Sequence, residues 1–346
     1  MKDNRKKIVF ILNPISGVIN KSGIPKLVEK HLDKKMYDYS IVYTQYAGHA
    51  TVLAAQASRD GADVVVAVGG DGTINEVGRG LINTSTAMAI VPCGSGNGLA
   101  RHLMIPINIA KAIKIINKCE IHDLDYCMIN DTPFFCTCGM GFDAFISMKF
   151  AEDGKRGPMK YIEHVLKEGL RYKPDIYTIE DENGKKNKHK AYLISCANAS
   201  QYGNNAYIAP QASMSDGMMD IIIMEPFDIL DAPQVSFDLM NKTLDKSSKI
   251  KSFRSKCVHI HRSHPGPVHF DGNPALFDED ITIRIVEKGI RIVVNPDADK
   301  KLRRPNAVQN AVTELFNNIS GVRGDITKQG RKLQAMNKML WRKINQ

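Results

Sequence analysis

The chain has 346 residues, a length that suits two domains and a tail better than a single core. Apolar residues make up 43% of it and charged residues 24%, a balance that excludes wholesale disorder. No apolar run approaches the ~20 residues of a membrane-spanning helix, and the short apolar run at residues 8–12 is too brief for a secretory signal. We therefore expect a cytoplasmic protein in which the seven cysteines are reduced thiols.

The net charge of +10 is concentrated at one end of the chain. Residues 300–346 hold eleven lysines and arginines against two acidic residues, which leaves the rest of the chain close to neutral. A basic tail on a near-neutral body is typical of proteins that meet a polyanion, either nucleic acid or an anionic membrane surface. Charge by itself does not choose between these partners.

The first 125 residues alternate strand and helix signals. Four apolar runs have the length of strands, at residues 7–13, 40–44, 62–68 and 87–91. Helical patterns lie between them, at residues 25–32, 47–59 and 74–81. Strands this apolar are buried on both faces, so the pattern predicts a parallel sheet wrapped by helices. Ligands of such sheets bind at the carboxyl ends of the strands.

After about residue 125 the pattern changes to short strands joined by turns. The strand signals lie at residues 134–138, 176–180, 191–197, 219–224, 256–261 and 281–286, and helical patterns lie at residues 159–170 and 228–244. This order predicts a mainly antiparallel β-sandwich. We therefore expect an α/β domain at residues 1–128, a β-sandwich domain at residues 129–300 and a basic helical tail at residues 301–346.

The turn after the third predicted strand, residues 67–76 (AVGGDGTINE), has the composition of a phosphate site. Gly69, Gly70 and Gly72 lack the Cβ atoms that keep a ligand away from the backbone, and the N-terminus of a helix follows them. A carboxylate beside phosphates is repelled unless a divalent cation lies between them. The presence of Asp71 therefore predicts Mg²⁺.

The same turn contains a capping-box pattern, from Thr73 to Glu76. On its own the loop is equally typical of a tight turn with a helix cap. Two further loops favour the phosphate site: residues 94–98 (GSGNG) follow the next strand, and residues 13–17 (NPISG) follow the first. The chain has no Gly-Lys-Ser/Thr P-loop and no Gly-x-Gly-x-x-Gly after the first strand, which argues against common P-loop ATPases and dinucleotide dehydrogenases.

Three motifs occur together in this chain: Asn-Pro-x-Ser-Gly at residues 13–17, Gly-Gly-Asp-Gly-Thr at 69–73 and Pro-x-Gly-Ser-Gly-Asn at 92–97. In this order and spacing they resemble the diacylglycerol kinase catalytic-domain family, over residues 5–300. Gly-Gly-Asp-Gly alone is shared with NAD kinases and phosphofructokinases, whereas the set of three is specific. The resemblance implies an α/β domain that binds ATP and Mg²⁺, a β-sandwich that builds a lipid pocket, and an active site between them.

The resemblance also implies roles for individual residues. The expected ATP-binding positions are Asn13, Ser16, Gly17, Thr44, Gly69, Gly70, Asp71, Gly72, Thr73, Ile74, Asn75, Glu76, Gly94 and Ser95. The expected metal-binding positions are Asp71 and Asp125 for the catalytic ion, and Ser213, Asp216 and the carbonyl of Met218 for a structural ion. Asp271 is the expected general base that takes the proton of the acceptor hydroxyl. The Asp-Gly pair at this position is by itself equally typical of a hairpin turn.

These features predict an ATP-dependent lipid kinase that transfers a γ-phosphoryl group to the hydroxyl of diacylglycerol or a sphingoid-type lipid. Many bacterial members have Asp-Gly-Glu where this chain has Asn273 in the third position, and Asn-Asp where it has Asn97-Gly98. The Gly-Ser-Gly-Asn-Gly form of this chain, at residues 94–98, resembles the sphingoid-kinase branch. Two alternatives therefore stay open, an NAD kinase-like enzyme and a catalytically weak regulator that binds nucleotide or lipid.

The basic tail has the pattern of an amphipathic helix, because residues 333–344 interleave apolar residues and Trp341 with basic ones. Such helices lie in the interface of anionic membranes, so we expect peripheral contact with the inner membrane face. A helix docked on the protein is the alternative. Nucleic acid is not expected, since the basic residues have no aromatic interleaving beyond Trp341. The oligomeric state stays open, with a homodimer among the alternatives.

Two further groups have side chains that bind metals in other proteins. Four histidines lie close together in sequence, at His259, His261, His264 and His269. A metal site and a surface hairpin are the two interpretations of this cluster. Cys136 and Cys138 alternate within an apolar stretch, which favours core packing over zinc binding.

Overall fold

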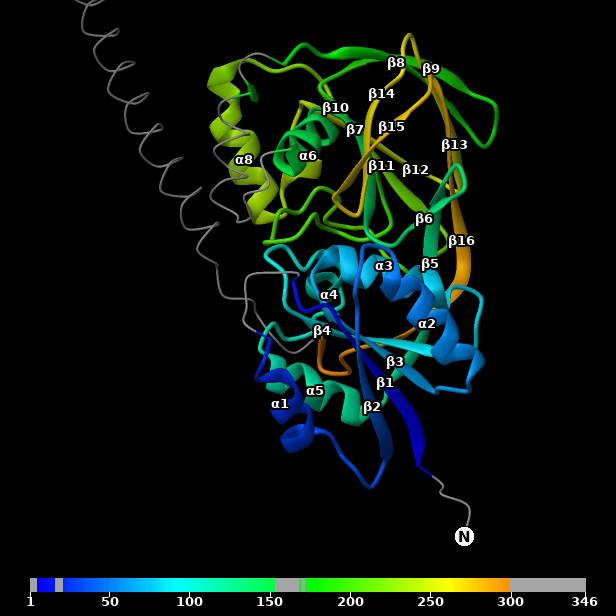
Figure 1. Cartoon of the computed structure of the whole chain (residues 1–346). Helices are drawn as coiled ribbons and strands as arrows, with labels where there is room; N and C mark the ends of the chain where they lie inside the picture. The colour runs from blue at the N-terminus through cyan, green and yellow to red at the C-terminus, as the bar shows by residue number, and fades with distance from the viewer. Residues whose placement is uncertain (1–4, 16–20, 153–167, 170–171, 299–346) are drawn as a thin grey trace, which may run out of the picture.

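The structure, a computed structural model, describes residues 5–15, 21–152, 168–169 and 172–298 (Figure 1). Ser16, Gly17, most of the helix expected at residues 159–170 and the basic tail at residues 301–346 lie outside the described residues. The described chain forms two stacked halves, with the N-terminal half below and the C-terminal half above in Figure 1. No helix in the described part of the chain combines the length and apolarity needed to cross a bilayer.

Parallel strands form the core of the N-terminal half. In spatial order they are β2 (Tyr37–Tyr43), β1 (Lys6–Leu12), β3 (Val64–Gly69) and β4 (Ala87–Pro92). Every residue of β3 and β4 is buried, because helices cover both faces of the sheet. The expected parallel α/β sheet is therefore confirmed.

Helices connect these strands and cover the sheet. They are α1 (Ile24–His31), α2 (His49–Arg59), α3 (Asp71–Leu81), α4 (Gly98–His102) and α5 (Ile109–Lys118). Helix α1 packs on α5 and α2 packs on α3, on opposite sides of the sheet (Figure 1). The second pair is close because a Cβ added at Gly80 would lie 2.6 Å from the carbonyl of Thr51. This approach holds the end of α3 against the start of α2.

The C-terminal half is a sandwich of two sheets. The six-stranded sheet runs in the order β12 (Ile250–Ser255), β11 (Met219–Met224), β10 (Leu193–Ala197), β7 (Thr137–Gly141), β14 (Gly266–Phe270) and β15 (Asn273–Phe277). The facing layer contains β5 (Ile121–Ile129), β6 (Thr132–Phe134), β8 (Asp175–Asp181), β9 (Lys186–Ala191), β13 (Cys257–Arg262) and β16 (Asp280–Val293). Apolar side chains such as Phe134, Ile221 and Ile260 fill the space between the layers. The expected mainly antiparallel sandwich is confirmed.

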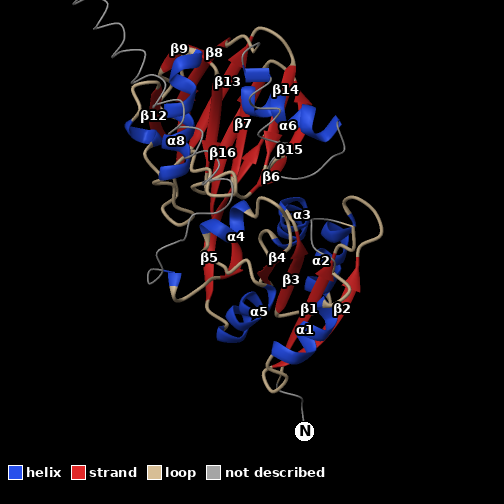
Figure 2. Cartoon of the chain, turned by 90° about the vertical axis from the view of Figure 1, so that its left-hand side faces the viewer, coloured by secondary structure: helices blue, strands red, loops and turns tan. Residues whose placement is uncertain are grey.

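Helices cover the outer face of the six-stranded sheet. Residues of α6 (Phe142–Glu152) and α8 (Ala232–Asn241) share a buried cluster with β10 and β11, and the two helices lie in front of the sheet in Figure 2. The short helices η1 (Ile229–Asp231) and η2 (Leu244–Lys246) flank α8. The helix expected at residues 228–244 is therefore present, divided into three pieces.

Strand β16 joins the two halves. It pairs with β13 in the sandwich, follows β5 along most of its length, and ends beside β4 of the parallel sheet. A bulge between Val286 and Ile290, with Lys288 at φ +52°, redirects the strand between these partners. The larger sheet consequently has ten strands and runs through both halves. A division of the chain at residues 128 and 300 stays a prediction, and it separates the N-terminal sheet from a strand that completes it.

The structure also differs from some of the expected elements. The run at residues 134–138 is two strands, because β6 ends at Phe134 and β7 begins at Thr137. Strands β9, β12, β14 and β15 lack a sequence signal. Strand β9 is an edge strand with exposed lysines, and charged edge strands do not show the apolar alternation of central ones.

Candidate active site

Three loops meet where the parallel strands end. Leu12 pairs with both Tyr43 and Val68, and Gly69 pairs with Pro92, so the carboxyl ends of all four strands share one edge. Thr44 continues this edge, because its buried backbone amide donates to the carbonyl of Leu12 over 3.0 Å. The expectation that the glycine-rich loops lie together is therefore confirmed.

The loops touch one another directly. A Cβ added at Gly94 would lie 2.6 Å from the Cα of Gly70, so these two glycines allow backbone-to-backbone contact. The Asn13 amide donates to the Thr73 hydroxyl over 3.3 Å, which connects the first loop to the second. A Cβ added at Gly69 would lie 2.4 Å from that same hydroxyl oxygen. Side chains larger than hydrogen would therefore separate the loops.

Helix α3 begins directly in the second loop, at Asp71, and its N-cap residue is Gly70. The backbone amides of its first turn, including that of Gly72, have no partner within the helix. They point with the positive end of the helix dipole toward the shared edge. This arrangement fits an anion such as a phosphate group, as the loop composition predicts. Ile74, in the same turn, is buried and packs the helix onto the sheet.

The capping-box interpretation of this loop is wrong. No side chain caps α3, since the helix begins two residues before Thr73. The Glu76 carboxylate accepts hydrogen bonds from the backbone amides of Gly48 and Ala50, over 2.9 and 3.1 Å. Because Gly48 is the N-cap of α2 and has no side chain, Glu76 caps the neighbouring helix instead.

Asp71 links the second loop to the third. One carboxylate oxygen accepts from the backbone amide of Asn97 over 2.8 Å, and the other accepts from that of Gly98 over 2.6 Å. Burial raises the pKa of Asp71 most strongly, hydrogen bonds from the backbone amides of Asn97, Gly98 and Asp71 itself lower it, and the charge of Asp271 raises it. The net effect is a raised pKa. Gly96 is required here because its Cβ would lie 3.0 Å from an oxygen of Asp71.

The third loop is closed by Asn97, which leaves Ser95 at its tip. The side chain of Asn97 accepts from the amide of Gly94 over 2.9 Å and donates to the carbonyl of Gly94 over 2.7 Å. Asn97 has φ +54°, a left-handed conformation that asparagine tolerates better than most residues. Ser95 is half-buried, and its hydroxyl makes no hydrogen bond to another described residue. A phosphate oxygen is a suitable partner for that hydroxyl.

A magnesium ion fits this site through one protein ligand. The Asp71 carboxylate accepts from the amides of Asn97 and Gly98 and from its own backbone amide, and because a carboxylate has about four lone-pair sites, one is left for a metal ion. Among the described residues no three acidic, histidine or cysteine side chains converge as a metal site. Magnesium in phosphate-transfer sites is held through one or two carboxylates together with phosphates and waters. The donor set at Asp71 is of that kind.

Asp271 lies where the α/β half meets the sandwich. Its carboxylate accepts from the side chain of Asn75 in α3 over 2.8 Å, and from the backbone amides of Phe135, Cys136 and Thr137 over 2.9, 2.7 and 3.2 Å. Burial raises the pKa of Asp271 above its ordinary value, although these four hydrogen bonds oppose the shift. The carboxylate therefore holds α3 against the start of β7.

The turn that carries Asp271 is also the hairpin turn that an Asp-Gly pair favours. Asp271 and Gly272 both have positive φ, at +48° and +80°, as the two central residues of a tight hairpin turn require. Asn273 follows at the start of β15, and its side-chain oxygen would lie 3.7 Å from a Cβ at Gly72. The residue in which this chain departs from many bacterial members thus lies beside the phosphate loop.

Asp125, expected near the catalytic metal, is buried within β5. Its two oxygens accept from the backbone amides of Gly217 and Lys288, over 2.9 and 2.8 Å. The carboxylate thereby holds the turn before β11 and the bulge of β16 on either side of β5. A metal-binding role for Asp125 stays a proposal.

The residues expected to hold a structural magnesium ion have other partners. Asp216 accepts from the amide of Met218 over 3.2 Å and forms an ion pair with Arg254. The hydroxyl of Ser213 lies 3.2 Å from that of Ser215. Asp216 is therefore paired with Arg254 in this structure, and a structural-ion role for Ser213, Asp216 and the carbonyl of Met218 stays a prediction.

Sequence reasoning missed a lysine at the site. Lys21 is buried, and its ammonium group donates to the carbonyl of Asn13 at the end of β1. Its charge lies close enough to the third loop to oppose the upward shift of the Cys93 pKa. Buried lysines are rare, and a cation near the glycine-rich loops adds to the attraction for phosphate. The signal in the sequence was a lone lysine shortly after the Asn-Pro motif.

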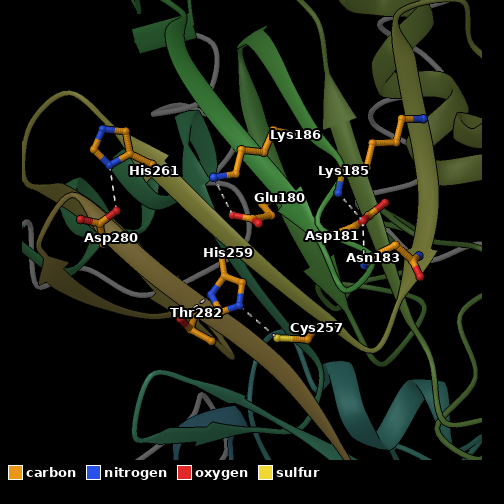
Figure 3. A network of polar contacts seen from close by, with 10 residues as sticks. All are labelled: Glu180, Asp181, Asn183, Lys185, Lys186, Cys257, His259, His261, Asp280 and Thr282. Atoms are coloured by element: carbon orange, nitrogen blue, oxygen red, sulfur yellow. Dashed lines mark hydrogen bonds and ion pairs between the residues drawn. The ribbon is translucent and has the colours of Figure 1, made fainter.

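The four histidines do not form one cluster. His259 and His261 lie on the exposed face of β13, where they contact Thr282 over 2.9 Å and Asp280 over 2.8 Å (Figure 3). The surface interpretation is therefore confirmed for these two. It is wrong for His269, which is 2% exposed and contacts the carboxylate of Asp143.

Cys136 and Cys138 are both buried, so the expected core packing is confirmed. Burial raises the pKa of each thiol well above its ordinary value. Thiols in this environment stay protonated at neutral pH, and they are poor metal ligands and poor nucleophiles.

Two family models match successive parts of the chain. Residues 7–129 match the diacylglycerol kinase catalytic domain, and residues 137–301 match the YegS C-terminal NAD kinase beta sandwich-like domain. A probable lipid kinase YegS from Salmonella arizonae is 29% identical over 257 residues, which cover 72% of this chain and 84% of that protein. A probable lipid kinase YegS-like protein from Chromohalobacter salexigens is 26% identical over 241 residues, covering 68% and 77%.

A solved structure has the same fold. A diacylglycerol kinase from Bacillus anthracis superposes with a TM-score of 0.67 at 22% sequence identity, covering 85% of this chain and 99% of that one. The two family models, the curated relatives and the loops that meet at the sheet edge agree with one another. Residues 7–129 of the chain belong to the diacylglycerol kinase catalytic-domain family, and residues 137–301 match the YegS C-terminal domain.

Proposed function

We propose that this protein is an ATP-dependent lipid kinase that transfers the γ-phosphoryl group to a hydroxyl of diacylglycerol or a sphingoid-type lipid, with magnesium as cofactor. The family membership and the names of the curated relatives support a lipid acceptor. The observation that carries the proposal is the direct contact of three loops at one sheet edge, beside which the buried Lys21 donates to the carbonyl of Asn13.

The phosphate groups of ATP would lie over the start of α3. Amides at Gly70, Gly72 and Thr73 and the hydroxyl of Ser95 supply donors, and Lys21 supplies positive charge. Phosphoryl transfer has a loose transition state, so positioning and charge stabilisation are the main contributions a protein makes. Magnesium bound to Asp71 would neutralise charge on the phosphates.

Asp271 would take the proton of the attacking hydroxyl. The new oxygen–phosphorus bond forms as the bond to the β–γ bridging oxygen breaks, and the proton passes to the carboxylate late in the transfer. A raised pKa makes this carboxylate a better proton acceptor than an exposed one. Asn75 donates to the same carboxylate from α3, so the base and the phosphate loop keep a fixed separation.

The acceptor resides in a bilayer, so the protein must reach a membrane surface. We propose that the basic tail, residues 301–346, supplies this contact at the inner membrane face. Each lysine or arginine near an anionic surface contributes roughly 1 kcal/mol. The contact should consequently weaken as ionic strength rises.

The test is a kinase assay with several acceptors. Purified protein is incubated with labelled ATP and Mg²⁺, and with micelles of diacylglycerol or sphingosine or with NAD. We expect label in a lipid, dependent on magnesium, and a loss of about 10²-fold or more in Asp271→Ala. The surface variant Asp131→Ala should keep full activity. Label in NAD, or lipid product that Asp271→Ala leaves unchanged, would contradict the proposal.

A further inference from the structure

A buried polar cluster lies behind the hairpin that carries Asp271. It consists of Asp143 from α6, Tyr202 from the loop after β10, and His269 from β14. One oxygen of Asp143 lies 2.8 Å from the Tyr202 hydroxyl and 3.0 Å from Nε2 of His269. The other oxygen accepts from the amide of Ala144 over 2.8 Å. We call this group the Asp143 cluster.

A glycine in the six-stranded sheet leaves space for the Asp143 cluster. Gly139 in β7 lies between Ser195 in β10 and His269 in β14, as its direct cross-strand neighbours. A Cβ added at Gly139 would lie 2.3 Å from an oxygen of Asp143 and 2.8 Å from Nε2 of His269. The gap left by this glycine is thus the space in which carboxylate and imidazole meet. Any larger residue would separate them.

The cluster adjoins the candidate active site from the sandwich side. His269 precedes Asp271 by two residues in the same hairpin. The carbonyl of Tyr202 would lie 3.0 Å from a Cβ at Gly98, and the amide of Gly98 donates to Asp71. The cluster is therefore close to both the proposed base and the phosphate loops.

Aromatic rings adjoin the polar cluster under α6. Phe142 lies next to Asp143 in sequence, and its ring centroid is 4.6 Å from that of Tyr192 and 5.4 Å from that of Tyr172. Tyr192 also packs on Phe227, with centroids 5.0 Å apart. A small polar group beside a large apolar one matches the two ends of a lipid, a headgroup and its hydrocarbon chain.

One atom of the cluster has no partner. Nδ1 of His269 is buried and makes no hydrogen bond to any described residue, whereas Nε2 faces Asp143. A carboxylate accepts but does not donate, so Nε2 is the ring nitrogen that donates to Asp143, and Nδ1 is left to hydrogen-bond with another group. Buried polar atoms without a partner are rare in folded proteins and call for an explanation.

We propose that the Asp143 cluster binds the hydroxyl-bearing headgroup of the acceptor lipid, with Nδ1 of His269 hydrogen-bonded to a headgroup hydroxyl, a group that both donates and accepts. This inference rests on the proposed function, because it places the headgroup of the same acceptor. Asp143 orients the ring of His269, and Tyr202 in turn orients Asp143. The headgroup thereby lies between the cluster and Asp271.

The alternative is that the Asp143–His269 pair only stabilises the fold and does not contact the lipid. Two substitutions of His269 distinguish these roles by their effects on lipid binding. The side-chain amide of His269→Gln reaches the position of Nε2, keeps the contact with Asp143 and removes Nδ1. The amide of His269→Asn occupies the position of Nδ1 and loses the contact with Asp143. A headgroup contact therefore predicts that the glutamine variant is the worse one for lipid, and a purely structural pair predicts the reverse.

We expect His269→Gln to raise the KM for dioctanoylglycerol about 10-fold, the effect of losing one hydrogen bond, while the KM for ATP stays unchanged. His269→Asn should raise the lipid KM less. The matched control is His261→Gln, because His261 forms an exposed pair with Asp280 of similar length, 2.8 Å, on the other sheet (Figure 3). This control should change neither constant. A larger rise in lipid KM for His269→Asn than for His269→Gln would overturn the proposal.

A second measurement does not depend on turnover. Protein with ¹⁵N-labelled histidine is titrated with dioctanoylglycerol, and the His269 resonances are assigned from their loss in His269→Asn. We expect the Nδ1 resonance of His269 to shift on saturation while that of His261 does not. A lipid that binds and shifts this resonance without being phosphorylated would contradict the proposed function and support the headgroup contact. Phosphorylation of the lipid without a shift of this resonance would support the proposed function and contradict the headgroup contact.

Discussion

Asp71 and Asp271 are two carboxylates that occupy one interface, and each is surrounded by hydrogen-bond donors of the protein. Their hydrogen bonds alone would lower their pKa values, but burial outweighs this effect, and the charge of Asp271 raises the pKa of Asp71 further. A proton consequently binds the folded protein more readily than the unfolded chain at both positions. This difference makes the stability of the protein depend on pH in a predictable direction.

The first prediction concerns that dependence. Between the ordinary value of 3.8 and the raised pKa of Asp271, the folded state holds more protons than the unfolded one. The free energy of unfolding therefore falls as pH rises through this window and levels off above it. Replacing Asp271 with Asn removes one titrating group, so the stability difference between wild type and Asp271→Asn should fall with rising pH and then become constant.

Urea denaturation at half-unit intervals from pH 4 to pH 7.5 measures this difference. The surface variant Asp131→Asn provides the control for loss of a carboxylate without loss of its buried environment. A stability difference between wild type and Asp271→Asn that rises with pH in this window would show a lowered pKa. In that case the four hydrogen bonds would outweigh burial.

Some residues of the candidate site could be predicted from the sequence and others could not. The glycines at positions 69, 70 and 94 were predictable, because a turn between strand and helix needs close backbone approach at fixed local spacing. His269 was not, since its partner Asp143 lies 126 residues away and its burial depends on α6. The partner of Asp216 was likewise hidden, because Arg254 reaches it from the neighbouring strand.

At the scale of elements, the two helices that flank the phosphate loop depend on each other. Helix α2 begins at His49 after Gly48, a residue without a side chain to cap it. The carboxylate of Glu76, from the second turn of α3, accepts two of its free backbone amides, and the hydroxyl of Thr51 donates back to the Glu76 carbonyl over 2.8 Å. The start of α2 is therefore anchored to the helix that would bind phosphate.

The second prediction follows from this anchor. Glu76→Ala should lower the free energy of unfolding by about 1–2 kcal/mol, because it removes a charged cap at the positive end of the helix dipole. Thermal unfolding followed by circular dichroism measures it. Asn108→Ala is the benchmark, since Asn108 is the local cap of α5 and accepts a single amide over 3.1 Å. A smaller loss for Glu76→Ala than for Asn108→Ala would contradict the cross-helix cap.

Elements were predictable where their signal is local. The strands β1, β3 and β4 are nearly continuous apolar runs, and the alanine-rich α2 has a clear helical period, so their ranges agree with expectation within a few residues. The C-terminal half is harder, because β14 and β15 form a short hairpin whose pairing with β7 depends on tertiary contact. Propensity carries little information for strands of this kind.

For the whole molecule, the order of strands in space decides how the halves depend on each other. Ile292, near the end of β16, is fully buried and pairs with Met88 of β4 on one side and with His122 of β5 on the other. The same strand pairs with β13 in the sandwich. Both halves therefore share one continuous sheet, and opening one of them leaves buried strand edges of the other exposed.

The third prediction is that the described halves unfold together. Ile292→Ala removes buried methylene groups from the shared strand, at a cost of about 2–5 kcal/mol. Hydrogen exchange under mild urea, read by mass spectrometry in peptides from β1 and β10, should show the same loss of protection in both. Leu276→Ala is the control, because Leu276 is 73% exposed on β15. Loss of protection confined to β1 would mean that the sandwich is stable without the parallel sheet, and that the long strand is a linker between two independent cores.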